Sequence, residues 1–432
     1  MSAQTQAPPT DETWPTARPG VQARIPWRGP VLYLGVGLLA LVAFGLLTPA
    51  ADTTRFMVSS GRDFVEIAPF AVPSRTSALV LSVAALALAA WATVRTTRRA
   101  SVPTWVPLVF GGLVLLAFLV WVMAGNATAL PLTVLLTGAL TLAVPLIFGS
   151  LAGLLCERSG IINIAIEGQL LAGAFLAVVV ASLTENPYAG LVAAPVAGAL
   201  VGLVLVLFAV RYWIDQIIVG VVLNVLVIGV TNYLFSTLLT QNPQTLNSPP
   251  RLPTLPIPLL SEVPVLGPVL FNHSLVVYLM YVAVAVLQVL VFRSRWGLRM
   301  RAVGEHPKAA DTVGIKVNRT RVVNTVLGGA VAGLGGAALV SAGLAFTKEL
   351  TSGRGYIALA AMILGRWSPK GALAASLLFG FADSLRQVLN NLGSPVPSQF
   401  LSMLPYLATI FAVAGLVGRV RAPAAEGIPY VK

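Results

Sequence analysis

Long apolar runs separated by short polar segments follow one another along almost the whole chain. A membrane-spanning helix needs about 20 mostly apolar residues, and around twelve runs approach or reach that length. They lie near residues 31–48, 77–94, 106–124, 130–155, 161–183, 189–210, 214–239, 274–292, 322–346, 355–366, 371–388 and 401–418. The run at 355–366 is too short to cross alone at about 1.5 Å of rise per residue, so we predict a half-helix or a re-entrant segment covered by protein. The pattern predicts an all-α polytopic integral membrane protein with about 10–12 transmembrane helices.

Composition supports the membrane assignment. Hydrophobic residues make up 57% of the 432 and charged residues 10%, whereas soluble domains carry about 25% charged residues. The single cysteine, Cys156, excludes an internal disulfide and a cysteine metal cluster.

The net charge of +13 is distributed unevenly along the chain. If the N-terminus lies inside and the runs alternate, the inner segments hold 21 of the 28 Lys and Arg residues, eight of them within 293–321. This is the positive-inside distribution that sets membrane orientation. The basic charge therefore indicates topology rather than nucleic-acid binding, and both termini are predicted to be cytoplasmic.

The chain divides by composition into four segments. Residues 1–29 are polar and rich in Pro and Thr, which predicts a disordered cytoplasmic tail. Residues 30–128 predict a membrane region of three plain helices; the first run is longer than a signal-peptide core, so a retained helix is favoured over a cleaved signal. Polar residues enter the apolar runs of the core, 129–418, which includes the basic loop 293–321; residues 419–432 form a C-terminal tail.

Motifs for catalysis or energy conversion are absent from the sequence. It has no G-x-x-x-x-G-K-[ST] phosphate loop, no H-E-x-x-H and no G-x-S-x-G, and its only histidines are His273 and His306. The runs also lack a series of carboxylates typical of a proton relay. We therefore expect no catalytic residue, no metal site and no cofactor in this chain.

Two loops stand out between the runs. Within 293–321, the stretch "GEHPKAADTVGI" predicts a short helix, with Pro307 in its first turn and Gly314 as its stop. This helix suits a lever for a soluble partner, although the loop could equally be a solvated segment that enforces topology. The loop 240–273 carries eight prolines, which predict an extended excursion that either docks an external protein or caps helix ends.

Five stretches occur in the order typical of one transporter family. They read "CERSGIINIAIEGQLLAGAF", "DQIIVGVVLNVL", "GLRMRAVGEHPKAADTVGIKVNRTR", "GRGYIALAAMILGRWSPKGALAASLLFGFADSL" and "LPYLATIFAVAGLVGRVRAPAAEGIPYVK". From about residue 129 onward the chain resembles the permease subunits of ATP-binding-cassette (ABC) importers for branched-chain amino acids, monosaccharides and nucleosides. The resemblance is greatest to the nucleoside (basic membrane protein-type) branch, which the long proline-rich loop also resembles.

The resemblance implies a transport subunit of the bacterial cytoplasmic membrane that is not itself an enzyme. It implies that the subunit moves a small polar solute, with nucleosides as the first candidate. It implies three protein partners: a cytoplasmic ABC ATPase that holds ATP and Mg²⁺, a second homologous permease and an extracytoplasmic solute-binding lipoprotein. A permease for monosaccharides or branched-chain amino acids is the alternative within the class. An ion-coupled secondary transporter is the alternative from another class; it predicts paired broken helices, and the sequence shows one such break near 355–371.

The resemblance also assigns the basic loop to ATPase coupling. The family's coupling helix falls at about 304–314, and its motif positions fall on Gly304, Glu305, Ala309, Ala310, Gly314 and Ile315. His306 stands where Asn is expected.

Polar residues within the runs are candidates for the substrate path. Asn163 and Glu167 are four residues apart and share a face if both are helical; they line the path or Glu167 pairs with Arg158 at the inner interface. Gln216 and Asn224 also share a face, and their neutral amides suit an uncharged polar solute or a bond between helices.

Three further side chains carry expectations of their own. Asp383 and Arg386 are expected to neutralise each other. Trp367 is expected to anchor the chain at the membrane interface, or else to stack on a nucleobase. The pair Gly329 and Gly333 predicts close helix packing.

Overall fold

The computed structural model describes residues 27–59, 63–103, 105–393, 396–397, 399–403, 406 and 422–431. Most of the predicted tail at 1–29 and of the predicted span at 401–418 lies outside the described residues.

Within the described residues, nine helices are long and apolar enough to cross a membrane. They are α1 with its π-helical continuation η1 (Arg28–Leu39, Ala40–Leu46), α2 (Ser74–Thr97), α4 (Leu132–Glu157), α5 (Ile166–Thr184), α6 with η2 (Pro187–Val206, Leu207–Arg211), α7 with η3 (Gln216–Leu234, Phe235–Leu239), α10 (Leu275–Arg293), α13 (Val317–Val340) and α15 (Pro369–Asn391). Two apolar helices are shorter: α3 (Val106–Val122) and α14 (Arg354–Leu364). The all-α polytopic class is confirmed, and the short run near 355–366 forms α14.

Helix ends follow local sequence signals. The Asp215 carboxylate accepts hydrogen bonds from the N–H groups of Ile217 (2.8 Å) and Ile218 (3.2 Å), and so caps α7. Asn186 caps α6 in the same way, with Pro187 in the first turn, where its missing N–H costs nothing. Such side chains supply the acceptors that the first N–H groups of a helix lack.

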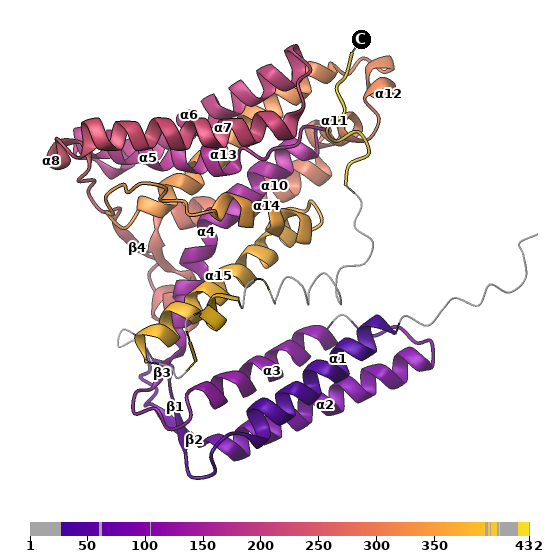
Figure 1. Ribbon diagram of the computed structural model, residues 1–432, viewed down its shortest axis with the longest axis vertical. Helices are drawn as coiled ribbons and strands as arrows, with labels where there is room; N and C mark the ends of the chain where they lie inside the picture. The colour runs from indigo at the N-terminus through magenta and orange to yellow at the C-terminus, as the bar shows by residue number, and fades with distance from the viewer. Residues whose placement is uncertain are drawn as a thin grey trace, which may run out of the picture.

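The first three helices form a bundle that a small sheet joins to the core (Figure 1). Strand β1 (Thr53–Met57) pairs antiparallel with β2 (Phe70–Pro73) and parallel with β3 (Leu130–Pro131), which leads directly into α4. A hydrophobic cluster with Leu119 of α3 and Leu385 of α15 packs beside the sheet. The bundle is therefore attached at the end of the molecule that carries the strands, which we call the loop end.

Glycines let the core helices approach closely. A Cβ on Gly333 of α13 would overlap the carbonyl oxygen of Ala194 in α6, and a Cβ on Gly198 of α6 would overlap that of Gly329. Only hydrogen fits at these positions, so the predicted packing role of the Gly329–Gly333 pair is confirmed.

The proline-rich loop folds back onto the core instead of extending. It contains α8 (Pro243–Leu246), β4 (Thr254–Pro256), the 3₁₀ turn η4 (Leu260–Glu262), α9 (Leu266–Leu270) and β5 (Asn272–Ser274), and β4 pairs with β5. The N–H of Ser248 donates to Ser182 Oγ (3.0 Å) on α5, and that of Leu252 donates to the Ser341 carbonyl (3.0 Å) after α13. The prediction of an extended excursion was wrong, because these hydrogen bonds hold the loop over the ends of core helices as a cap.

The opposite end, which we call the basic end, carries α11 (Arg295–Glu305), α12 (Pro307–Thr312) and the C-terminal residues 422–431 (Figure 1). The single helix predicted at about 304–314 is instead two helices, since the chain breaks at His306 before Pro307. Gly314 ends the second helix region at φ +85°, the left-handed conformation that favours glycine.

Candidate functional site

Two helices begin beside the interior of α4, away from both of its ends. The Ser150 hydroxyl of α4 donates to the Ala358 carbonyl of α14 (2.8 Å), and Gly149 lies against both Ala358 and Ile166, the first residue of α5. Gly149 is eight residues before the end of α4 at Glu157, which is about 12 Å along the helix axis. The N-terminal parts of α5 and α14 therefore meet well below the basic end.

Glu167 holds these two helix starts together. Its Oε1 accepts hydrogen bonds from Thr351 Oγ1 (2.6 Å) and the Gly353 N–H (2.8 Å), and its Oε2 accepts from the Gly355 N–H (2.6 Å). The residue is 4% exposed and lies in the first turn of α5. A carboxylate at a helix N-terminus is stabilised by the helix dipole and by the free N–H groups. Both carboxylate oxygens are thus occupied by the start of α14 and by Thr351.

The alternative pairing of Glu167 with Arg158 is wrong. Arg158 instead donates from Nε (3.0 Å) and Nη2 (2.9 Å) to the Trp367 carbonyl in the turn between α14 and α15. Burial lowers the pKa of Arg158, and the nearby Glu305 carboxylate opposes that shift.

Asn224 and Gln216 lie on the buried face of α7 and hold the segment that leads into α5. Asn224 Oδ1 accepts from the Gly168 N–H (2.8 Å), and its Nδ2 donates to the Ile164 carbonyl (2.9 Å). Gln216 Oε1 accepts from the Ile162 N–H (2.7 Å). The shared face of the two amides is confirmed, since both are at most 2% exposed.

Asn163 lies in the non-helical segment before α5, so its predicted helical face with Glu167 is wrong. Its Nδ2 donates to Gln169 Oε1 (3.0 Å) and to Cys156 Sγ (3.4 Å). The structure nevertheless brings Asn163, Glu167, Gln216 and Asn224 to one junction, formed by residues 160–169, α7 and α14. That they line the substrate path stays a prediction.

Tyr356 joins this junction and was missed by sequence reasoning. Its hydroxyl oxygen lies 3.1 Å from Asn224 Nδ2, which donates to it, while 48% of the residue is exposed. The hydroxyl is fixed and the side chain remains accessible, an arrangement that suits stacking on a flat ligand. The signal available in the sequence was an aromatic residue at the start of a run too short to span.

The predictions for Trp367 and for the pair Asp383–Arg386 have opposite outcomes. Trp367 is 6% exposed and donates from Nε1 to Glu157 Oε2 (2.6 Å), so its assignment as an interfacial anchor is wrong. Arg386 and Asp383 form the predicted ion pair, with Nη2 and Oδ1 2.8 Å apart.

The predicted coupling residues divide into buried and exposed ones. Gly304 packs directly against the Arg158 carbonyl, and Ala310 is 3% exposed in a small core with Val303 and Val317. Ile315 is half-buried, whereas the remaining three are exposed: Glu305, Ala309 and Gly314. Val313, which sequence reasoning missed, is 75% exposed just after α12.

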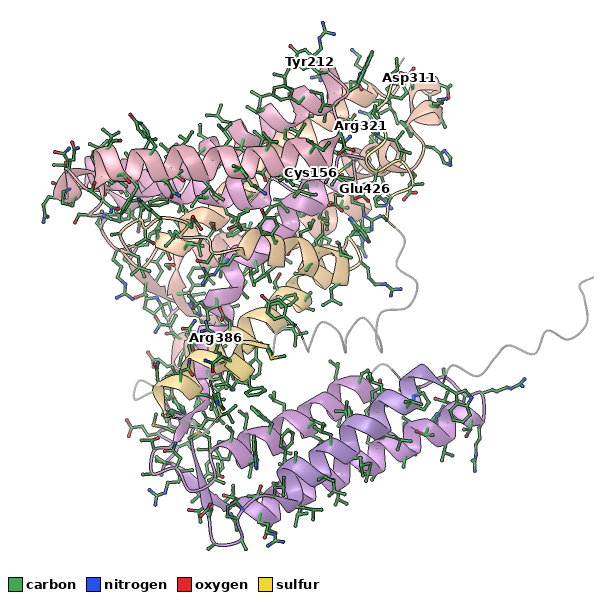
Figure 2. The ribbon with its side chains drawn as sticks, viewed as in Figure 1. Cys156, Tyr212, Asp311, Arg321, Arg386 and Glu426 are labelled. Atoms are coloured by element: carbon green, nitrogen blue, oxygen red, sulfur yellow. The ribbon has the colours of Figure 1, made fainter. Side chains whose placement is uncertain are left out.

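The C-terminal residues 422–431 pack against this surface. The Ala425 N–H donates to the Gly304 carbonyl (2.8 Å), the Ala424 N–H donates to Glu305 Oε2 (3.3 Å), and Arg321 Nη1 donates to the Ile428 carbonyl (2.9 Å). Figure 2 shows Arg321 and Glu426 close together at the basic end. The segment thus ties α11 to the start of α13, although the sequence was read only as a tail.

Nine apolar helices of spanning length within the described residues define a multi-pass membrane protein. Comparison with known families places it further. Residues 134–414 match the branched-chain amino acid transport system / permease component family, and the chain belongs to this family of ABC permeases.

Individual relatives cover the same part of the chain. It is 39% identical over 311 residues to the guanosine ABC transporter permease protein NupQ of Bacillus subtilis, covering 70% of this chain and 97% of the relative. It is 35% identical to the nucleoside ABC transporter permease protein NupC of Lactococcus lactis, covering 70% and 98%. It is 31% identical to the putative glucose ABC transporter permease protein TsgC13 of Haloferax volcanii, covering 66% and 92%. No solved structure matches the chain.

Proposed function

We propose that this chain is a permease subunit of an ATP-driven importer that moves nucleosides into the cell. The strongest support for nucleosides as the substrate is sequence identity. This chain is 39% and 35% identical to permeases named for guanosine and for nucleosides, over nearly the whole length of those relatives. The basic end would face the cytoplasm, where ATP and Mg²⁺ are held by a separate ATPase. A second homologous permease and an extracytoplasmic solute-binding lipoprotein complete the proposed assembly. A sugar permease is the second candidate, favoured by the 31% identity to a putative glucose permease.

The junction of α5, α7 and α14 supports an uncharged solute. The oxygens of Glu167 are occupied by the Thr351 hydroxyl and two backbone N–H groups, so the carboxylate has little capacity left for a charged ligand. The accessible group there is Tyr356, an aromatic side chain whose hydroxyl is held by Asn224. A nucleoside offers a neutral flat base to such a ring, whereas an amino acid brings two charges that need partners. We therefore place the nucleoside path along the exposed side of Tyr356.

The stacking role of Tyr356 can be tested with one variant that removes its hydroxyl group and one that removes its ring. Tyr356→Phe keeps the ring and should leave the KM for nucleoside uptake within about threefold, whereas Tyr356→Ala should raise KM about fivefold or more, given about 1–3 kcal/mol per stacked base. The exposed Tyr188 on α6 provides a control, because Tyr188→Ala removes a ring remote from the junction. Equal KM values for Tyr356→Ala and wild type would exclude Tyr356 from the path.

The surface around α12 supports docking of the ATPase. Val313 presents an apolar side chain at the tip, next to the exposed Ala309 and Gly314. Exposed apolar residues on a helix end are typical anchors for a groove on a partner. The C-terminal segment and the Gly304–Arg158 contact then connect that tip to the turn at Trp367, which directly follows α14. Movement imposed on α12 would thereby reach the helix whose start Glu167 holds.

The first experiment is to tag the C-terminus, extract native membranes in mild detergent and identify the co-purifying proteins by mass spectrometry. We expect an ATPase and a second permease in fixed stoichiometry. Val313→Asp should release the ATPase while the chain stays inserted, because Val313 is 75% exposed. Val65→Asp is the matched control, since Val65 is 63% exposed at the loop end. A chain that purifies alone and transports without ATP would support the secondary transporter instead.

A further inference from the structure

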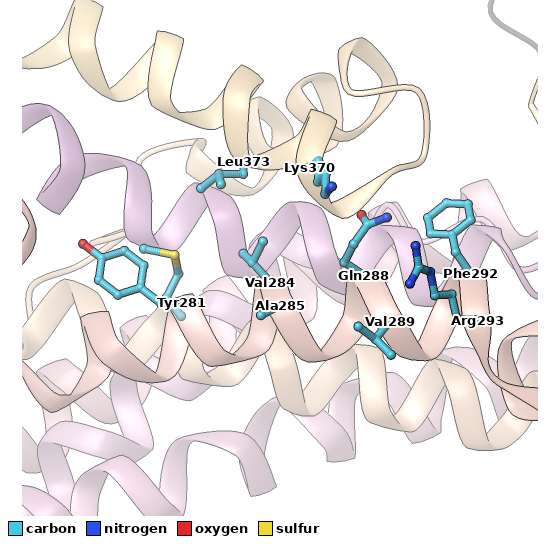
Figure 3. Close-up of a pocket in the computed structure, with 10 residues that line it drawn as sticks. Tyr281, Val284, Ala285, Gln288, Val289, Phe292, Arg293, Lys370 and Leu373 are labelled. Atoms are coloured by element: carbon cyan, nitrogen blue, oxygen red, sulfur yellow. The ribbon is translucent and has the colours of Figure 1, made fainter.

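A groove runs between α10 and α15 at the basic end, away from the junction described above. Its volume is about 440 Å³, within the range of small-molecule sites. The wall is apolar along most of its length, with Tyr281, Val284 and Leu373, and polar at one end, with Gln288, Arg293 and Lys370 (Figure 3). The groove is thus amphipathic along its own axis.

The dimensions match one leaflet of a bilayer. The lining residues of α10 extend from Met280 to Arg293, the last residue of the helix, a rise of about 20 Å. The hydrocarbon core of one leaflet is about 15 Å thick, half of the usual bilayer value. Arg293 ends α10 and Lys370 begins α15, so both cations lie at the level of the headgroups when the apolar wall lies in the hydrocarbon.

Among the described residues, no carboxylate serves as counter-ion to the two cations. In the described parts of the chain, neither has a carboxylate oxygen within 4.0 Å, and none of the described lining residues is acidic. Lys370 also lies in the first turn of α15, which holds no acidic residue. A cation is unfavourable at a helix N-terminus and an anion is favourable there. The position of Lys370 is therefore consistent with an anion bound at this end of the groove.

Gln288 is the polar residue between the cationic end of the groove and its apolar wall. Its Oε1 is buried and has no hydrogen-bond partner among the described residues. Figure 3 shows its amide directed toward Lys370, between the cationic end and the apolar wall. The residue is five positions before Arg293, about 7 Å deeper along the helix. This is the depth of the glycerol esters of a phospholipid, below its phosphate.

We propose that the groove binds one anionic glycerophospholipid of the cytoplasmic leaflet. The phosphate lies between Lys370 and Arg293, and the glycerol region meets the Gln288 amide, whose Nε2 donates to an ester carbonyl. One acyl chain follows Val284 and Leu373 toward Tyr281. Basic pockets between transmembrane helices on the cytoplasmic side suit such headgroups. The bound lipid fills the space between α10, which leads into α11, and α15.

The test uses the intact purified assembly in nanodiscs that contain phosphatidylcholine with or without phosphatidylglycerol. Native mass spectrometry should show one phosphatidylglycerol retained per chain, at least tenfold more than phosphatidylcholine. The double variant Lys370→Gln/Arg293→Gln should lose that retention. The double variant Arg98→Gln/Arg211→Gln is the matched control, because it removes the same charge from exposed residues outside the groove.

A second pair of variants tests the apolar wall with the charges intact. Ala285→Phe places a ring in the groove from an exposed position and should displace the lipid. Val282→Phe, on a residue of α10 that is 56% exposed and does not line the groove, should not. Equal loss in the groove and control variants would overturn the proposal, because it would show non-specific attraction. Displacement by millimolar inorganic phosphate, or a crosslink from Ala285→Cys to a sister subunit, would likewise overturn it in favour of a soluble anion or a protein contact.

Discussion

Replacement of Glu167 is expected to weaken the whole junction between α5 and α14. Glu167→Ala removes the acceptor of three hydrogen bonds, two of them from backbone N–H groups that cannot turn away. Each buried donor left unsatisfied costs about 1–3 kcal/mol, so with two backbone donors left unsatisfied Glu167→Ala should lower the free energy of unfolding by roughly 2–6 kcal/mol. Glu167→Gln keeps one acceptor oxygen but directs an amide N–H₂ toward the Gly355 N–H, which should cost about 1–3 kcal/mol.

The assay is equilibrium unfolding in mixed detergent, followed by tryptophan fluorescence. Glu185→Gln serves as the control, because Glu185 is an exposed residue at the other end of α5. The expected order of stability is control, Glu167→Gln, Glu167→Ala. If the unfolding free energies of both Glu167 variants matched that of the control while nucleoside uptake was lost, the residue would be a substrate ligand and the structural reasoning would be refuted.

Three further predictions concern helix packing, a carboxyl group of the C-terminal segment and a buried hydrogen bond. Gly333→Ala places a methyl group against the Ala194 carbonyl and should destabilise the protein by about 1–3 kcal/mol; Gly112→Ala, with no atom within 4 Å of the new Cβ, should be neutral or slightly stabilising in thermal unfolding. Burial raises the pKa of Glu426 above its ordinary value of 4.5, so its contribution to docking is full below that pH and is lost as the pH rises through the raised value. Glu426→Gln should therefore strengthen docking and slow proteolytic removal of a C-terminal tag at pH ~7.5. It should have no effect near pH ~4, where the carboxyl is protonated. Equal effects at both pH values would contradict the direction of the pKa shift. Trp367→Phe removes the donor to Glu157 and should cost about 1.5–3 kcal/mol, with near-wild-type stability as the contrary result.

Features that depend on local sequence were predictable. Helix spans follow from the length of the apolar runs, and α14 was expected to be a half-helix because its run is too short. The close approach at Gly329 and Gly333 follows from their four-residue spacing, which places both on one helix face. The pair Asp383–Arg386 follows from the same geometry.

Features that depend on distant contacts were not predictable from one sequence. The donors to Glu167 lie 184 to 188 residues further along the chain, and no local pattern links them. Trp367 was expected at the interface because tryptophan is common there, yet a buried carboxylate provides its partner. The docking of residues 422–431 depends on Arg321, whose burial in α13 only the fold reveals.

The central claim is ATP-driven nucleoside import through this subunit. The most direct test reconstitutes the purified assembly in liposomes, adds the solute-binding lipoprotein and labelled guanosine on the loop-end side, and varies ATP on the basic-end side. The account predicts uptake that requires hydrolysable ATP and is lost in Val313→Asp, the variant expected to release the ATPase. Guanosine uptake at the same rate without ATP, or by the chain alone, would contradict it.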